Sequence, residues 1–287
     1  MSCKGLLWQQ NSLKVIKLFW ILLWIKGVVM DIVVCIKQVP EEIVINKKTG
    51  TLIRDNVKAT INSCDKNAIE LAVSLKEKHT ARITLVSMGP SDVEKTLTYG
   101  LAMGADQAVL LCDKAFAGSD TLATALVLST AIKKIKYFDL ILCGKETSDS
   151  GTQQVGPQIA QYLGIPQITS VADLSIKDDN IHATRELKDE FETLTAKLPV
   201  LVTVNKGINK PRLPTYIDIY EASDKNISIW SANDIKVNKG RIGLDGSPTK
   251  IGNIFQPEKK RRCLMLKGST SDVSSNLITY LRNKGLV

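Results

Sequence analysis

The chain has 287 residues, an apolar fraction of 44% and a formal net charge of +9, which suits one large α/β domain or one domain with appendages. Its two histidines, His79 and His182, are far apart, so we expect neither a metal site nor a Ser-His-Asp or Cys-His catalytic unit. The basic cluster at 259–262 contains no aromatic residue, and a nucleic-acid surface is therefore not indicated.

The six cysteines include no Cys-x-x-Cys pair, and Cys35 and Cys143 lie within apolar runs. Both features are typical of buried free thiols in a reducing compartment. We therefore expect a cytoplasmic protein.

The first 29 residues differ from the rest of the chain, since they hold three of its four tryptophans and four lysines but no acidic residue. The apolar run 18–25 is too short to span a bilayer, and no small-residue cleavage site follows it. A strand pattern begins directly at Met30. We expect residues 1–29 to be a non-native upstream extension without stable membrane insertion; an amphipathic anchor is the alternative.

From Met30 to about residue 165, strand and helix patterns alternate. Strands are expected at 31–37, 82–87, 107–112 and 140–143, with a small two-stranded excursion at 42–55. Helices are expected from the cap at 62–65 to residue 78, from a capping box at 91–94, from 120–121 to 134, and from 154 to 163. This alternation predicts βαβ units and a parallel sheet covered by helices on both faces.

After Gly164 the pattern changes. Successive strands are expected at 171–177, 180–186, 190–198 and 200–205, and a last helix at 269–284 capped by Ser269, Thr270 or Ser271. From residue 206 prolines recur and long periodic runs are few. We therefore expect an α/β domain over 30–205, with a β-arm from about 165, and an extended arm with a C-terminal helix over 206–287.

The segment 140–157 runs from an apolar strand through a small, polar loop into a helix start. Backbone N–H groups at a helix N-terminus attract anions such as phosphate. Its glycines allow close approach of a ligand, and its short polar side chains can contact a ribose or phosphate. The loop is long for such a connection, which favours a functional role; an ordinary strand–loop–helix connection is the alternative.

Two further segments are expected beside this loop, namely the turn 36–40 and the cap 62–65, because parallel strands present their carboxyl ends at one edge of the sheet. Asp149 would orient a ribose or cap the next helix, and Asp120 with Thr121 would contact a diphosphate or act as an N-cap. Lys145 is a phosphate partner or a solvated lysine. Neither a Gly-x-Gly-x-x-Gly nor a Walker A motif occurs, which argues against an NAD Rossmann site and an ATPase loop.

Seven segments, taken in order and spacing, resemble the β subunit of electron transfer flavoproteins. They are 34–40, 86–90, 102–106, 118–124, 144–157, 197–199 and 209–212. The resemblance extends from Met30 to the C-terminus. It implies an α/β fold whose parallel-sheet nucleotide-binding domain is of the adenine nucleotide alpha hydrolase-like type, with a β-arm and an extended C-terminal tail that pack on a partner subunit.

The resemblance also implies a heterodimer whose α subunit carries FAD. The β subunit then holds AMP as a structural ligand or, in the electron-bifurcating and anaerobic type, a second FAD that accepts a hydride from NADH. We expect FAD here, because 116–123 and 154–157 resemble the bifurcating type, although Gly151 replaces the second carboxylate of its loop. No residue is expected to act as a general acid, base or nucleophile, since the flavin carries the chemistry.

The expected cofactor-binding residues come from both arguments, and Met88 from the resemblance alone. They are Cys35, Lys37, Asn62, Ser63, Cys64, Asp65, Met88, Asp120, Thr121, Gly144, Lys145, Glu146, Thr147, Ser148, Asp149, Ser150, Gly151, Thr152, Gln153, Gln154 and Val155. The segment 193–209 resembles the recognition loop that binds acyl-CoA dehydrogenases, with Ile208 as its apolar anchor; packing on the α subunit is the alternative for Ile208.

Two other classes of protein stay open. A universal-stress-type ATP-binding protein shares a similar α/β core, but it would lack the strands and tail after residue 165. A scaffold subunit with an empty pocket would yield no nucleotide on extraction. The sequence therefore favours an electron carrier subunit over a stand-alone enzyme.

Overall fold

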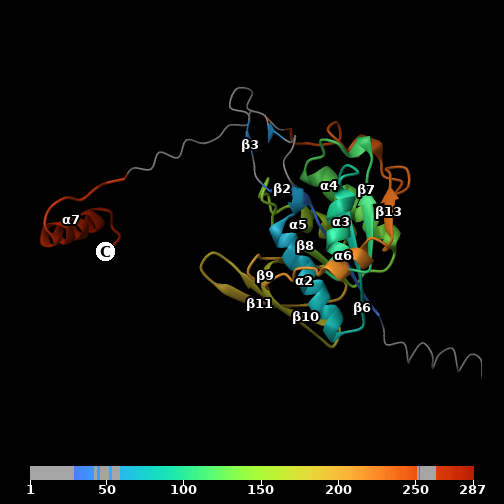
Figure 1. Ribbon diagram of the computed structural model, residues 1–287, viewed down its shortest axis with the longest axis horizontal. Coiled ribbons are helices and arrows are strands. Elements are labelled where there is room, and N and C mark those ends of the chain that lie inside the picture. The colour runs from blue at the N-terminus through green and yellow to red at the C-terminus, as the bar shows by residue number, and fades with distance from the viewer. Residues whose placement is uncertain (1–28, 42–43, 46–51, 54–58, 251, 253–262) are drawn as a thin grey trace, which may run out of the picture. The chain divides into compact units, whose positions relative to one another are not determined.

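The computed structural model describes residues 29–41, 44–45, 52–53, 59–250, 252 and 263–287 (Figure 1). Two compact units result, one made of 1–44 and 52–252 and the other of 45–51 and 253–287. Residues 1–28, on which the expectation of an upstream extension depends, lie outside the described residues, as does the basic cluster 259–262. Among the residues that are described, no helix has both the length and the apolar composition of a membrane span.

The first unit is built on a nine-stranded sheet with the strand order β11-β10-β9-β12-β8-β1-β6-β7-β13. Every neighbouring pair from β9 to β13 is parallel, which confirms the predicted parallel sheet. The parallel strands are β1 (Met30–Cys35), β6 (Ala81–Met88), β7 (Gln107–Leu111), β8 (Leu140–Gly144), β9 (Gln167–Lys177), β12 (Val200–Val204) and β13 (Ile227–Trp230).

The expected β-arm belongs to this same sheet. Strand β10 (Asn180–Glu186) pairs antiparallel with β9 and with β11 (Phe191–Lys197), so the arm extends one edge of the sheet as a meander. Strand β12 returns to the parallel part, between β9 and β8.

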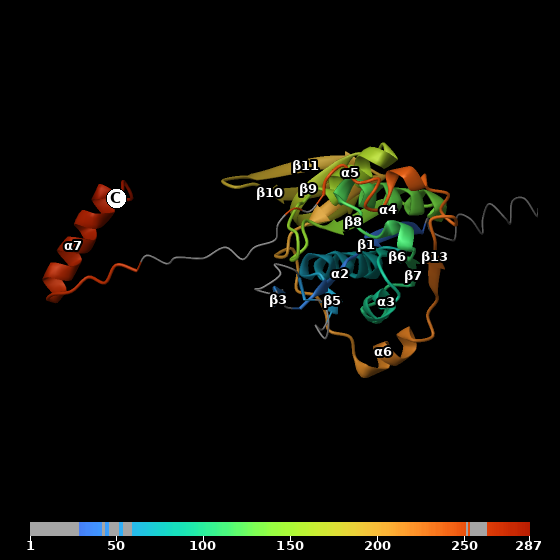
Figure 2. The same cartoon turned by 90° about the horizontal axis from the view of Figure 1, so that it is seen from above.

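Helices cover both faces of the sheet, as predicted (Figure 2). One face carries α2 (Ser63–Lys78) and α3 (Val93–Ala102), and the other carries α4 (Thr121–Ile135) and α5 (Val155–Leu163). Side chains of strand β1 pack against the helices on both faces, because successive strand residues point to opposite sides of the sheet. Ile32 and Val34 pack into the core under α2 and α3, whereas Val33 and Cys35 pack into the core under α4 and α5.

Two short ribbons stand apart from the main sheet. Strand β2 (Gln38–Pro40) pairs antiparallel with β5 (Ala59–Ile61). Strand β3 (Val44–Ile45) pairs with β4 (Leu52–Ile53), which confirms a two-stranded excursion within 42–55; its turn lies outside the described residues.

One helix start differs from expectation. The capping box at 91–94 does not form, because the N-cap residue of α3 is Asp92 and its side chain makes no cap hydrogen bond. Asp92 has a helical backbone (φ −58°, ψ −18°) rather than the extended one that aims a side chain back at the helix. The backbone N–H of Glu94 donates to the carbonyl of Ser91 instead (2.9 Å).

The segment after residue 205 is more ordered than an extended arm. It contains α6 (Tyr216–Ala222), then β13 as the ninth strand of the sheet, and the 3₁₀ turn η2 (Lys239–Arg241). A further 3₁₀ turn, η1 (Lys114–Phe116), lies between β7 and α4. Ala232, Ile235 and Ile242 are buried under α4 and α5. The first unit therefore runs to Gly252 and not to residue 205.

The second unit contains α7 (Thr270–Asn283). Ser269 caps this helix through a complete capping box with Asp272, which confirms the first of the three expected caps. None of the residues of α7 is buried.

Candidate nucleotide-binding site

The three segments expected at one sheet edge do meet there. Strands β1 and β8 are neighbours with Cys35 opposite Cys143, so the turn after β1 and the loop after β8 begin side by side. The start of α2 joins them, because the backbone N–H of Asn62 donates to the carbonyl of Lys37 (3.0 Å). The convergence follows from the parallel topology, in which the carboxyl ends of strands share an edge.

A buried carboxylate ties these segments together. Asp65, only 4% exposed, accepts hydrogen bonds from the backbone N–H of Lys37 (2.7 Å) and of Gly144 (3.1 Å). A side chain at residue 144 would collide with it, since a Cβ there would lie 2.2 Å from Asp65 Oδ1 and 2.8 Å from the Cβ of Cys64. Asp65 therefore acts as a clamp between the ends of β1 and β8.

Burial raises the pKa of Asp65 to about 7, against the hydrogen bonds that it accepts from Lys37 and Gly144. The folded chain then holds this proton more tightly than the unfolded chain, whose aspartates have pKa values of about 4. The contribution of Asp65 to the free energy of unfolding is fully present below about pH 4. It falls by on the order of 4 kcal/mol as the pH rises to about 7. We expect denaturant unfolding of the full chain to show this decline between about pH 4 and 7.

The variant Asp65→Asn removes the titrating group and should flatten that decline, whatever its effect on absolute stability. Asp173→Asn, at an exposed position of β9, is the matched control and should keep the wild-type slope. Equal slopes in wild type and Asp65→Asn would refute the assignment of the decline to Asp65.

Asn62 holds the loop after β8 instead of capping α2. Its Nδ2 donates to the carbonyl of Glu146 (2.8 Å), and its Oδ1 accepts from the backbone N–H of Ser148 (3.2 Å). The helix does begin at Ser63, but Asn62 makes no side-chain cap bond. The predicted helix start is thus confirmed, whereas the predicted side-chain cap is wrong, because the loop takes both polar atoms of this amide.

The loop carries an ion pair with the turn after β1. Lys37 Nζ lies 2.6 Å and 2.9 Å from the two carboxylate oxygens of Asp149. Burial opposes ionisation of Asp149, but the hydrogen bonds from Lys37 and Thr147 outweigh it and hold the pKa of Asp149 below its usual value. Asp149 does not cap α5, whose N-cap is Gln154; that expectation is wrong because the carboxylate turns towards Lys37.

Hydrogen bonds within the loop set its shape. Thr147 Oγ1 and Ser150 Oγ lie 2.8 Å apart, and Gln153 Nε2 donates to Glu146 Oε2 (2.7 Å). Gly151 and Gln153 both have left-handed backbones, with φ of 60° and 58°. The glycine adopts this conformation without strain, which suits its place in the turn.

The N-termini of α4 and α5 lie together beside the loop, where Thr121 Oγ1 donates to Gln154 Oε1 (2.9 Å). Asp120 caps α4 by accepting from the backbone N–H of Ala123 (3.0 Å), which confirms its N-cap role. Its other carboxylate oxygen accepts from the hydroxyl (2.7 Å) and the backbone N–H (3.0 Å) of Thr249.

Two residues of this region, Ser247 and Thr249, were missed in the sequence. Ser247 Oγ accepts from the backbone N–H of Asp120 (2.8 Å) and donates to the carbonyl of Gly243 (2.6 Å). The available signal was the run of turn-forming residues at 243–249. Through these contacts with Asp120, Ser247 and Thr249 hold the segment 243–249 against the start of α4.

Thiols form the floor of the site. Cys35 and Cys143 lie against each other, and the hydrogen bond between them, with burial, raises the pKa of Cys143 well above its usual value. Burial likewise raises the pKa of Cys64. All five cysteines in the described part of the chain are free, and the buried Cys35, Cys64 and Cys143 serve as weakly polar packing groups. Met88, another expected residue, is the last residue of β6. The backbone N–H of Lys145, also expected, donates to the carbonyl of Val204 (2.9 Å).

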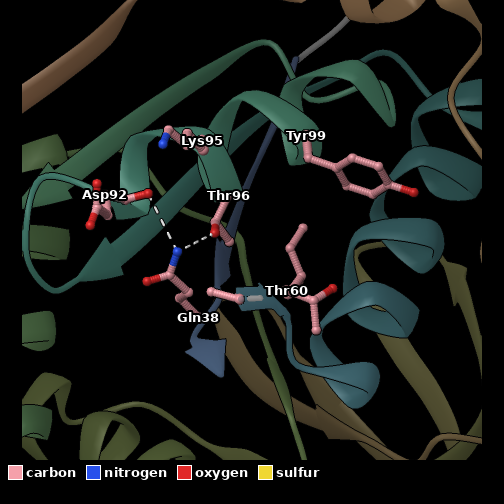
Figure 3. Close-up of a pocket in the computed structure, with 8 residues that line it drawn as sticks. Gln38, Thr60, Asp92, Lys95, Thr96 and Tyr99 are labelled. Atoms are coloured by element: carbon pink, nitrogen blue, oxygen red, sulfur yellow. Dashed lines mark hydrogen bonds between the residues drawn. The ribbon is translucent and has the colours of Figure 1, made fainter. Parts of the chain in front are cut away.

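A cavity of about 370 Å³ lies nearby, between the β2–β5 ribbon and α3 (Figure 3). It is lined by Gln38, Ala59, Thr60, Ile61, Asp92, Lys95, Thr96 and Tyr99. Gln38 Nε2 donates to Thr96 Oγ1 there (2.9 Å), whereas the neighbouring Lys37 reaches Asp149. None of the expected cofactor-binding residues lines this cavity, so it is distinct from the candidate site.

The fold and the site define a class, that of α/β proteins with a parallel sheet covered on both faces and a loop junction at the carboxyl ends of its strands. A family model described as "Electron transfer flavoprotein domain" matches residues 49–235. The chain belongs to the electron transfer flavoprotein family and is similar to its β subunits throughout most of its length. Family membership also removes the universal-stress-type alternative.

Three relatives illustrate this similarity. The electron transfer flavoprotein subunit beta of Thermoanaerobacterium thermosaccharolyticum is 43% identical over 261 residues, which cover 90% of this chain and 100% of that protein. That of Clostridium acetobutylicum is 42% identical over 257 residues, covering 89% and 99%. The caffeyl-CoA reductase-Etf complex subunit CarD of Acetobacterium woodii is 39% identical over 262 residues, covering 90% and 100%.

Proposed function

We propose that this chain is the β subunit of a heterodimeric electron transfer flavoprotein and that it binds FAD at the junction of 37, 62–65 and 144–155. The complex passes electrons between NADH or an acyl-CoA dehydrogenase and other redox partners, with a further FAD in the α subunit. The observation that carries the proposal is the clamped loop junction, in which Asp65 and Asn62 hold the loop after β8 at the carboxyl edge.

The residues present fit a nucleotide with phosphate groups. Gly144 lets Asp65 and Cys64 pack directly against the end of β8, which fixes the start of the loop. Lys37 supplies a cation whose present partner, Asp149, belongs to the loop itself. The adjoining N-termini of α4 and α5 add the positive ends of two helix dipoles. Bound flavin would supply the redox chemistry, while Lys37 and the helix starts bind its phosphates and Asp149 orients its ribose.

FAD and AMP are the two candidate ligands for this site. The resemblance of 154–157 to the bifurcating type supports FAD. AMP as a structural ligand is the alternative, and the loss of a second loop carboxylate at Gly151 supports it. In either case the buried thiols of Cys35 and Cys143 provide an apolar floor.

The test is to co-express the chain with its α subunit, extract the nucleotides and count FAD and AMP per heterodimer. We expect two FAD and no AMP. One FAD with one AMP would establish the single-flavin alternative, and α-subunit FAD alone would refute nucleotide binding by this chain. Lys37→Met should reduce the second nucleotide, whereas Lys95→Met, in the neighbouring cavity, should leave it unchanged.

We further propose that the segment around Ile208 docks a partner dehydrogenase. Ile208 is half-buried against the core under α2. Its neighbours fix the segment on that helix, since Asn67 Nδ2 donates to the carbonyl of Asn209 (2.8 Å) and Arg212 pairs with Glu70 (2.9 Å). The part of the Ile208 side chain that stays exposed would be the part that contacts the partner.

Ile208→Ala should slow electron transfer from an acyl-CoA dehydrogenase by about tenfold without loss of flavin, because an anchoring side chain is removed. Steady-state transfer at varied dehydrogenase concentration measures this. Unchanged kinetics in a fully loaded variant would exclude Ile208 from the docking surface.

A further inference from the structure

Helix α2 carries two polar side chains in its buried middle. Asn67 is 2% and Glu70 is 7% exposed, although amides and carboxylates are seldom buried unless a specific partner binds them. Their partners belong to the segment 205–212, which follows the end of β12. The same helix that contacts the candidate nucleotide site with its first turn therefore holds a second segment with its middle turns.

The bonds between α2 and this segment are numerous and partly charged. Asn67 Nδ2 donates to the carbonyl (2.8 Å) and to the side-chain Oδ1 (2.9 Å) of Asn209, whose Nδ2 donates back to the carbonyl of Asn67 (3.0 Å). The Glu70 carboxylate accepts from the backbone N–H (2.9 Å), Nε (2.9 Å) and Nη2 (3.0 Å) of Arg212. Paired charged groups of this kind form the stronger hydrogen bonds in proteins. Glu77 accepts from Nη1 alone (2.7 Å), and its side chain is 57% exposed.

The first turn of α2 is bonded to the candidate site. Asn62 and Asp65 bind the loop after β8 through their side chains. Asp65 and Glu70 are five residues apart, which is about 7.5 Å along the helix axis. A second link joins the loop to the segment without the helix, because the backbone N–H of Lys145 donates to the carbonyl of Val204 (2.9 Å). The loop, α2 and the segment are therefore bonded to one another in a closed ring.

We propose that Glu70 is a positioning residue through which α2 couples occupancy of the nucleotide site to the local stability of the segment 205–212. A nucleotide at the loop makes each opening that moves the start of α2 rarer, by the factor 1 + [L]/Kd. Because Glu70 and Arg212 join the segment to the same helix, openings of the segment become rarer with those of the loop. The coupling is reciprocal, so that a protein bound at the segment tightens nucleotide binding by the same factor. This inference rests on the proposed function, since it requires the nucleotide site.

Hydrogen exchange of the co-expressed heterodimer tests the coupling. The second nucleotide is removed, FAD or AMP is added back at about 100 times its Kd, and exchange in peptides covering 144–151 and 206–213 is followed by mass spectrometry. We expect both peptides to exchange more slowly by a common factor of up to about 100. In Glu70→Gln the peptide 206–213 should exchange fast with or without nucleotide, whereas 144–151 keeps its protection and the nucleotide Kd is unchanged.

A matched control changes a second carboxylate that contacts the same arginine. Glu77→Gln removes the exposed partner of Arg212 and should keep the wild-type coupling. If Glu70→Gln does not fold, Arg212→Met breaks the same pair from its more exposed side, since the Arg212 side chain is 38% and the Glu70 side chain 10% exposed. It should likewise remove the nucleotide dependence of 206–213.

The outcomes separate this inference from the proposed function. Bound FAD or AMP that leaves the exchange of 206–213 unchanged would overturn the inference and leave the proposed function intact. Wild-type coupling in both Glu70→Gln and Arg212→Met would overturn it as well, because the connection would then not pass through this pair. A heterodimer that binds no second nucleotide would instead refute the proposed function, and the inference with it.

Discussion

Gly144→Ala should destabilise the full chain by about 1–3 kcal/mol and deplete the nucleotide of its site, because the new methyl group overpacks a clamped junction. The added Cβ would lie 2.2 Å from Asp65 Oδ1, 2.8 Å from Cys64 Cβ and 3.0 Å from the backbone N of Asp65. Two of these atoms cannot move away as a side-chain end would, and the Asp65 carboxylate is held by the backbone N–H groups of Lys37 and Gly144. Relief therefore requires that the ends of β1 and β8 separate, and the loop that follows Gly144 moves with them.

The matched control is Gly207→Ala, where no atom lies within 4 Å of the added Cβ. Neither glycine has a left-handed backbone, so the two variants differ in packing and not in backbone strain. Denaturant unfolding and the extracted nucleotide content of the co-expressed complex are the measurements. If Gly144→Ala keeps both its stability and its nucleotide, the site does not depend on close packing at the end of β8.

Deletion of residues 263–287 should abolish assembly with the α subunit while the α/β unit stays folded. Helix α7 has a complete capping box, yet it buries no residue, and Leu277, Ile278 and Tyr280 are 45%, 49% and 44% exposed. A free helix of this length is marginal in water, so an apolar surface on the α subunit is the proposed source of its stability. The sheet and its two cores lie within 30–252.

Co-purification with a tagged α subunit and light scattering measure the assembly. A finer test is Leu277→Ser with Ile278→Ser, which should weaken assembly at least about tenfold if these side chains anchor the helix. The control Ser275→Ala with Asn276→Ala changes two adjacent polar positions of α7 and should assemble normally. Undiminished assembly of the deleted chain would show that the α subunit binds elsewhere.

Sequence patterns predicted the regular elements whose apolar residues are buried in the fold. Helix α2 was expected at 62–78 and is found at Ser63–Lys78, and strand β10 was expected at 180–186 and is found at Asn180–Glu186. Buried residues alternate at the start of β10, and α2 is apolar along most of its length because it is buried on nearly all sides. The secondary structure of such segments can be predicted from their sequence, because burial and local propensity favour the same element.

The elements that were missed lack that agreement. Most apolar residues of helix α6 are exposed to solvent, so their spacing in the sequence does not mark a buried helix face. Strand β13 has four residues at the edge of the sheet, too few to show a period. Its strand identity comes from pairing with β7, which lies more than a hundred residues earlier in the chain.

For the candidate site, the sequence alone was enough to locate the three segments, because parallel strands bring their carboxyl ends to one edge whatever the side chains are. Their side-chain partners were decided only by the tertiary structure. Lys37 and Asp149 are 112 residues apart, and Asp120 and Thr249 are 129 apart. Local propensity acts over a few neighbouring residues, whereas these bonds depend on how whole strands and helices pack, which turned Asn62 and Asp149 from helix caps into contacts of the loop.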